Sequence, residues 1–149
     1  MTLNLVDIEK SDIKYKISKF PDGQQTVDLT EWSDITRYVD EVRISSRLNS
    51  FKDLELIICT VQAIRNIQPD RGISLYVPYF LGSRSDRKFV EGGVNYLKQV
   101  ICPIINSLNF KSVIVLDPHS SSLESCLNNF KEIKNDSLVL FAINSIYNK

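Results

Sequence analysis

The sequence has few cysteines and no excess of either charge. Cys59, Cys102 and Cys126 are far apart and form no C-x-x-C pair, so neither a zinc site nor a thiol nucleophile has supporting spacing. We expect them to be core thiols in a reducing compartment. The 18 basic residues balance 18 acidic ones and are interspersed with them. This distribution predicts a mixed, solvated surface and argues against nucleic acid as a partner.

Long apolar runs and two glycine-rich motifs are also missing. Residues 1–10 hold no apolar stretch of the signal-peptide kind, and no run approaches the ~18 residues of a membrane span. We therefore expect a cytoplasmic protein without a membrane partner. Neither G-x-x-x-x-G-K-[ST] nor G-x-G-x-x-G occurs, which excludes a P-loop and the dinucleotide fingerprint. The 149 residues have the length of one domain, and we expect residues 1–149 to form one.

Short alternating or apolar segments predict several strands. They are Thr2–Val6, Ile13–Ser18, Gln24–Thr30, Val39–Ser45, Ile73–Val77, Ser112–Leu116 and Leu138–Ile143. The turn residues Pro21-Asp22-Gly23 join the second and third of these segments, which predicts an antiparallel hairpin.

Two longer segments have helical periodicity. The first begins at a capping-box pattern, Ser50-x-x-Asp53, and ends near Asn66–Pro69. The second covers Gly93–Leu108 and contains Pro103, which should kink it or cost a hydrogen bond. Strands that alternate with helices predict an α/β fold: a mostly parallel sheet flanked by helices, with the hairpin as an added antiparallel element.

Polar side chains follow two of the predicted core strands. Residues 78–88, after the strand Ile73–Val77, concentrate arginine and lysine, which suit phosphate oxygens. Residues 117–122, after the strand Ser112–Leu116, contain the only histidine, His119, beside Asp117 and three serines. A lone histidine is more often structural, and a charged loop is more often a solvated turn. Because ligands bind at the carboxyl ends of parallel strands, the two loops together favour a functional site.

The same loops carry a family resemblance. The segment Val77–Phe80, followed by Ser83–Lys88, is similar to the P-Y-F…R-Q-D-R-K segment of the ribose-phosphate pyrophosphokinases, or PRPP synthetases. The segment Asp117–Ser120 resembles their D-x-H segment, and Phe20–Gln24 resembles their F-x-D-G-E hairpin. Leu54–Arg65 resembles the helix before their second core strand. The motifs occur in the family's order over about residues 15–130. The resemblance implies a phosphoribosyltransferase-like α/β fold.

It also implies a reaction, the transfer of diphosphate from Mg-ATP to the anomeric hydroxyl of ribose 5-phosphate. By this resemblance Arg84 would contact the ATP phosphates and Asp86 would orient its loop, and Arg84, Ser85 and Asp86 would all belong to the ATP-binding set. His119 would help to hold Mg²⁺, with Asp117 as a neighbouring acid. Arg84 and His119 are thus the expected catalytic residues, with ATP and ribose 5-phosphate as substrates.

The hairpin residues Phe20, Asp22 and Gln24 would, by the same resemblance, reach the adenine of ATP bound mainly by a neighbouring subunit. Phe20 offers a stacking face, and Asp22 can accept a hydrogen bond from the adenine amino group. The chain is therefore expected to form a homo-oligomer or a complex with a C-terminal half.

Several positions depart from the family pattern. Ser85 replaces a glutamine, Gln24 replaces a glutamate, and Ser122 stands where many members have glutamine. The segment Ile8–Asp12 is too short for the helix that the family has there.

The family's sugar-phosphate loop, D-D-x-x-x-x-[ST]-G-x-T, is missing. The one adjacent acidic pair, Asp40-Glu41, lies in a strand-like stretch, and the sequence stops at Lys149, near the end of the family's first domain. We therefore predict the N-terminal half of a PRPP synthetase, inactive alone. A non-catalytic regulatory subunit of that enzyme is the alternative, and an unrelated phosphate-binding protein nearer the phosphoribosyltransferases is a third reading.

Overall fold

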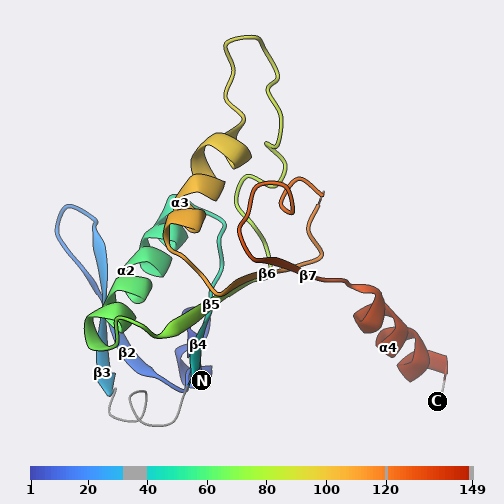
Figure 1. Cartoon of the computed structure of the whole chain (residues 1–149). Helices are drawn as coiled ribbons and strands as arrows, with labels where there is room; N and C mark the ends of the chain where they lie inside the picture. The colour runs from blue at the N-terminus through green and yellow to red at the C-terminus, as the bar shows by residue number, and fades with distance from the viewer. Residues whose placement is uncertain (32–39, 120, 148–149) are drawn as a thin grey trace.

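The computed structural model describes residues 1–31, 40–119 and 121–147, and a five-stranded parallel sheet lies at its centre (Figure 1). In spatial order the strands are β1 (Thr2–Asn4), β4 (Glu41–Ser45), β5 (Gly72–Val77), β6 (Ser112–Leu116) and β7 (Phe130–Ile133). Every neighbouring pair in this sheet is parallel. The predicted α/β class is confirmed. Val39, at the start of one predicted strand, lies outside the described residues.

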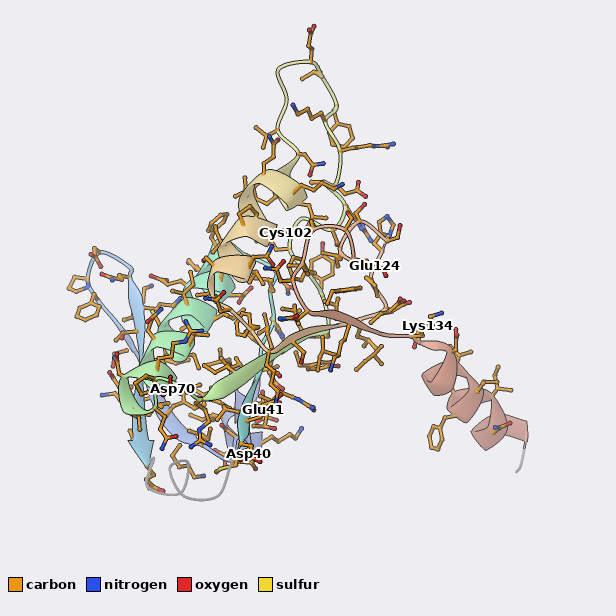
Figure 2. The ribbon with its side chains drawn as sticks, viewed as in Figure 1. Asp40, Glu41, Asp70, Cys102, Glu124 and Lys134 are labelled. Atoms are coloured by element: carbon orange, nitrogen blue, oxygen red, sulfur yellow. The ribbon has the colours of Figure 1, made fainter. Side chains whose placement is uncertain are left out.

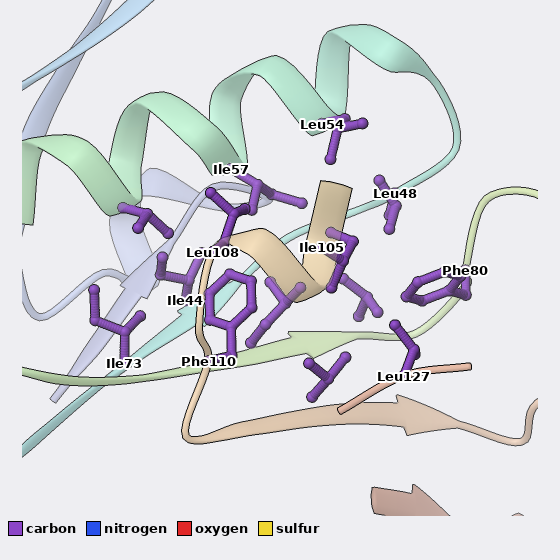
Figure 3. Close-up of a cluster of buried hydrophobic side chains, with 14 of the residues drawn as sticks. Ile44, Leu48, Leu54, Ile57, Ile73, Phe80, Ile105, Leu108, Phe110 and Leu127 are labelled. Carbon is purple, nitrogen blue, oxygen red and sulfur yellow. The ribbon is translucent and has the colours of Figure 1, made fainter. Parts of the chain in front are cut away.

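Two helical crossovers connect the central strands. Helix α2 (Phe51–Ile67) joins β4 to β5, and helix α3 (Cys102–Ser107) precedes β6. Apolar side chains of both helices pack against alternate residues of the strands, such as Ile44 and Ile73 (Figure 3). This buried layer is the hydrophobic core, because the central strands β4, β5 and β6 turn their apolar sides toward the helices.

Helix α2 begins where the sequence predicts. The Ser50 hydroxyl accepts a hydrogen bond from the Asp53 N–H at 3.4 Å, and the Asp53 carboxylate accepts one from the Ser50 N–H at 2.9 Å. These reciprocal bonds form the capping box and satisfy N–H groups that the first helical turn leaves unpaired. The buried stripe Leu54, Ile57 and Ile64 then faces the sheet.

The second helical segment starts later than predicted, at Leu97 and not at Gly93. A π-helical turn, Leu97–Ile101, leads into α3, and the Cys102 N–H donates to the carbonyl oxygen of Leu97. Pro103 then occupies the first turn of α3. There its missing N–H costs little, so the wide turn accommodates the proline within a continuous helical segment.

The predicted hairpin is confirmed as a separate antiparallel pair, β2 (Lys14–Lys19) and β3 (Gln25–Glu31). It lies against α2, where the Gln25 N–H donates to a Glu55 carboxylate oxygen at 3.2 Å. A single 3₁₀ turn, Ile8–Lys10, precedes it, in agreement with a segment too short for a full helix.

The C-terminal prediction is wrong. The segment Leu138–Ile143, predicted as a strand, lies within helix α4 (Asp136–Tyr147), and the last strand of the sheet is β7. A short apolar run cannot distinguish a strand from a helix by its periodicity. Helix α4 extends away from the sheet (Figure 1), and its apolar side chains include Leu140 and Phe141, 59% and 74% exposed.

A polar cluster lies near the amino ends of the central strands. The Ser112 hydroxyl donates to that of Ser74 at 2.9 Å, Ser74 donates to the Glu41 carboxylate, and Lys111 Nζ lies 3.0 Å from a Glu41 oxygen. The Ser74 hydrogen bond first, and then Lys111, lower the pKa of the Glu41 carboxyl.

Among the described helices, none has the length and apolar content to span a membrane.

Candidate functional site

The two polar loops leave neighbouring strands at the same edge of the sheet. Strands β5 and β6 are paired in parallel, with Val77 opposite Val115, so residues 78–88 and 117–122 both start at the carboxyl edge. Side chains from two neighbouring parallel strands can reach a common ligand at this edge. Ser120, in the second loop, lies outside the described residues.

A pocket of about 350 Å³ opens between these loops. It is lined by Pro78, Tyr79, Phe80, Ser83, Arg84, Val115, Leu116, Asp117, Pro118, His119 and Leu123. The guanidinium-bearing Arg84 and the imidazole-bearing His119, predicted from separate loops, thus line one cavity. Both side chains are exposed, as a residue that meets a solvated ligand must be.

The first loop is anchored by one buried aromatic side chain. Phe80 is 1% exposed and packs in the core, whereas its neighbour Tyr79 is 44% exposed (Figure 3). The Ser83 N–H donates to the Phe80 carbonyl at 3.1 Å, which closes a turn directly before Arg84. Gly82 within this turn has φ +82°, and a Cβ there would meet the Tyr96 ring at 3.0 Å. The turn therefore requires glycine for both its conformation and its close contact.

Asp86 ties the two loops together. Its carboxylate accepts a hydrogen bond from the Ser122 hydroxyl at 2.8 Å, and its carbonyl oxygen accepts one from the Asn95 side chain at 2.5 Å. The backbone of Ser85 is held as well, because its carbonyl oxygen accepts from the Leu97 N–H at 3.2 Å. The sequence marks Ser122 only as a departure from a family pattern and does not predict this contact. Asp86 and Ser122 are 36 positions apart in the sequence, and no motif connects them.

The second loop begins with an unusual backbone conformation. Asp117 has φ +44°, in the left-handed region that aspartate and asparagine enter more readily than other residues with side chains. Its N–H donates to the Ile133 carbonyl of β7 at 2.8 Å, so the sharp turn is held at the end of β6. A non-glycine residue in this conformation within a ligand pocket is a typical feature of functional sites.

The hairpin residues lie outside this pocket. Among the described residues that line it, Phe20, Asp22 and Gln24 do not appear. The Asp22 carboxylate accepts the Gln24 N–H at 3.1 Å within its own turn, and Phe20 is exposed at the hairpin tip. Gln24 lines a second, mostly apolar cavity of about 230 Å³ next to α2 and α3. Their predicted contact with adenine bound by another subunit stays a prediction.

The chemistry of the pocket suits a polyphosphate that carries its own metal ion. Within the described residues, no three His, Cys, Asp or Glu side chains gather in a metal-binding group. Mg²⁺ needs no such cage, because it commonly binds through one or two carboxylates, several waters and substrate phosphates. Asp117 offers a carboxylate of this kind, and Arg84 offers a forked donor to phosphate oxygens.

The fold and the pocket together define a parallel α/β domain with a candidate ligand pocket at the carboxyl edge of its sheet. Its fold is that of a PRPP synthetase half: the crystal structure of phosphoribosylpyrophosphate synthetase from Mycobacterium smegmatis aligns with 94% of this chain at a TM-score of 0.71. The sequences are 11% identical, so this likeness shows the fold alone. The chain spans 46% of that protein. No family model and no curated protein sequence matches the chain.

Proposed function

We propose that residues 1–149 are the nucleotide-handling half of a ribose-phosphate diphosphokinase, which transfers diphosphate from Mg-ATP to ribose 5-phosphate. The observation that carries this proposal is the pocket in which Arg84 and His119 come together at the ends of β5 and β6. The likeness of the fold to a PRPP synthetase supports the same choice of substrate class. The sugar-phosphate site would come from a second half, so this chain alone would not turn over.

The proposed roles follow from the charges in the pocket. Arg84 binds the ATP phosphates and offsets the negative charge that the transfer spreads over their oxygens. Asp117 and His119 orient the magnesium-bearing nucleotide, directly or through water. The anomeric hydroxyl of the sugar attacks the β-phosphorus and AMP leaves, a transfer that requires positioning and charge neutralisation more than covalent help from the protein.

Two further parts of the proposal concern the loop and the assembly. Ser85 and Asp86 hold the loop of Arg84 through the contacts with Leu97 and Ser122. The hairpin residues Phe20, Asp22 and Gln24 contact the adenine of a nucleotide on a neighbouring subunit, which makes the working form an oligomer. Light scattering tests this last point, since a strictly monomeric protein at working concentration contradicts it.

Titration calorimetry with Mg-ATP tests the site itself. We expect measurable binding, and a loss of affinity of roughly 10–100-fold in Arg84→Ala, the size expected for a charged hydrogen bond. His119→Ala should also weaken binding. Arg87→Ala is the matched control, because Arg87 lies in the same loop but outside the pocket, with its guanidinium 5.5 Å from the centre of the Phe89 ring.

Either of two results contradicts the site. The first is that Arg87→Ala weakens Mg-ATP binding as much as Arg84→Ala does. The loss of affinity would then reflect the overall positive charge of the loop and not a specific contact of Arg84. Mg-ATP could also fail to bind the unmodified chain. For the reaction, the chain is mixed with a C-terminal half of a PRPP synthetase and PRPP formation is measured. Failure to form PRPP while Mg-ATP binds would reject the enzymatic role and keep the nucleotide site.

A second candidate is a non-catalytic subunit that docks on a full-length PRPP synthetase. The exposed apolar side chains of α4, among them Leu140, Phe141 and Ile143, favour it, since exposed apolar patches often mark protein contacts. Absence of Mg-ATP binding together with co-elution with such an enzyme supports this candidate. Its matched test is Phe141→Ser, which should abolish co-elution.

A further inference from the structure

Two cysteines that the sequence separates widely meet in the fold. Cys102 in α3 and Cys126 in the loop before β7 have their sulfur atoms 2.7 Å apart, and both are thiols. This separation exceeds a disulfide bond by only about 0.7 Å. Figure 2 shows Cys102 on the helix and Glu124 on the loop that faces it. No C-x-x-C motif signals the pair, because the contact spans 24 positions.

The surrounding contacts hold this geometry. The Asn106 side chain donates to the Cys126 carbonyl at 2.8 Å, and its amide oxygen accepts from the Asn128 N–H at 2.9 Å. Leu127, in the same loop, is buried in the core. Residues 126–128 are therefore fastened to α3 from the Cys126 carbonyl onward. The packed fold therefore holds the two thiols next to each other.

We propose that Cys102 and Cys126 form a site of reversible thiol oxidation that reacts with a disulfide oxidant such as oxidised glutathione. The Cys126 thiolate attacks one sulfur of the oxidant, whose S–S bond breaks and releases one glutathione thiolate. Cys102 then loses its proton to water and attacks the Cys126 sulfur, which closes the internal disulfide and releases the second thiolate. Two protein thiols are oxidised, and one glutathione disulfide is reduced.

The order of attack follows from the surroundings of each thiol. Cys102 is 1% exposed, and burial first, then the contact with Cys126, raise the pKa of Cys102 well above its usual range. Cys102 is therefore a poor first nucleophile toward a dissolved oxidant and serves as the resolving thiol. Cys126 is half-buried and so is the more exposed thiol of the pair. Burial, and then Glu55, raise the pKa of Cys59, which makes the third thiol a slow-reacting internal control.

The bond would join the two loops of the pocket through α3. The helical segment that holds Cys102 also contacts the Arg84 loop, because the Leu97 N–H donates a hydrogen bond to the Ser85 carbonyl oxygen. The loop that holds Cys126 also contributes Leu123 to the pocket, four positions after His119. Oxidation would therefore fasten the His119 side of the pocket to the helix that supports the Arg84 side. This inference is independent of the proposed function, because its test measures thiol chemistry.

Peptide mapping tests the pair directly. The reduced full chain is treated with oxidised glutathione, free thiols are blocked, and the protein is digested with trypsin without reduction. The three cysteines fall in separate peptides, residues 53–65, 99–111 and 112–131. We expect the second and third peptides to be joined, the first to carry the blocking group, and reductant to separate the joined pair. The oxidised chain should also melt roughly 5–10 °C higher, since a closed loop restricts the unfolded chain.

The controls make the result decisive. Cys59→Ser should give the same joined peptides and the same rise in melting temperature, whereas Cys126→Ser should give neither. A glutathione group that stays on Cys126 without transfer to Cys102 overturns the proposal. So does a joined peptide that contains Cys59, or a disulfide that forms only between two chains.

Discussion

Replacement of Phe80 by alanine tests how the Arg84 loop is anchored. Phe80 is 1% exposed, so truncation removes a whole buried ring from the core under the pocket. Such truncations cost about 3–5 kcal/mol of unfolding free energy. A domain of this size has about 5–15 kcal/mol in total, so one side chain carries a large share of the stability. The melting temperature should fall by roughly 10 °C.

The matched variant is Tyr79→Ala, one position earlier in the same loop. Tyr79 is 44% exposed, and its loss should change the unfolding free energy by less than about 1 kcal/mol. Phe80→Leu should lower the unfolding free energy by an amount between those of the two alanine variants. It replaces Phe80→Ala in the comparison if Phe80→Ala does not fold. Urea unfolding followed by far-ultraviolet circular dichroism measures all three. If Tyr79→Ala lowered the unfolding free energy as much as Phe80→Ala or Phe80→Leu does, burial of the Phe80 ring would not be what anchors the loop.

Three further predictions concern capping, glycine conformation and a carboxylate. Ser50→Ala should lower the unfolding free energy by about 1 kcal/mol in urea titrations, because the capping box is lost. Gly82→Ala should lower it by about 1–2 kcal/mol, whereas Gly92→Ala, with open space and no left-handed φ, should cost almost nothing in thermal melts. Because the fold lowers the pKa of Glu41 from 4.5, its ionised form stabilises the protein above that value. The urea midpoints of the wild type and Glu41→Gln should therefore differ at neutral pH and converge as the pH falls through the lowered pKa.

Local signals predicted the central part of the fold. The capping box at Ser50 placed the start of α2, and Pro21-Asp22-Gly23 placed the hairpin turn, because both depend on neighbouring residues alone. The meeting of the Arg84 and His119 loops could also be anticipated. Strands joined by a helical crossover are parallel and often adjacent, so their carboxyl ends share an edge of the sheet.

Features that depend on distant residues were missed. Strand β7 is short and largely exposed, and it forms because the edge of β6 offers it backbone partners. The apolar segment around Phe141 was then misassigned as the last strand. The bond between Asp86 and Ser122, and the meeting of Cys102 with Cys126, bring together residues with no recognisable spacing. Such contacts are set by packing and leave no mark in the local pattern.

The backbone at Asp117 has a consequence for the mutational tolerance of the pocket. A left-handed conformation with φ +44° admits glycine, asparagine and aspartate and disfavours β-branched residues, whatever ligand is present. Under the proposed function this position therefore carries two separate requirements, one on shape and one on charge. Asp117→Asn and Asp117→Gly should preserve the fold while removing the charge. Asp117→Val should lose both the fold and the charge. A library screened first for folding and then for nucleotide binding would separate the two requirements.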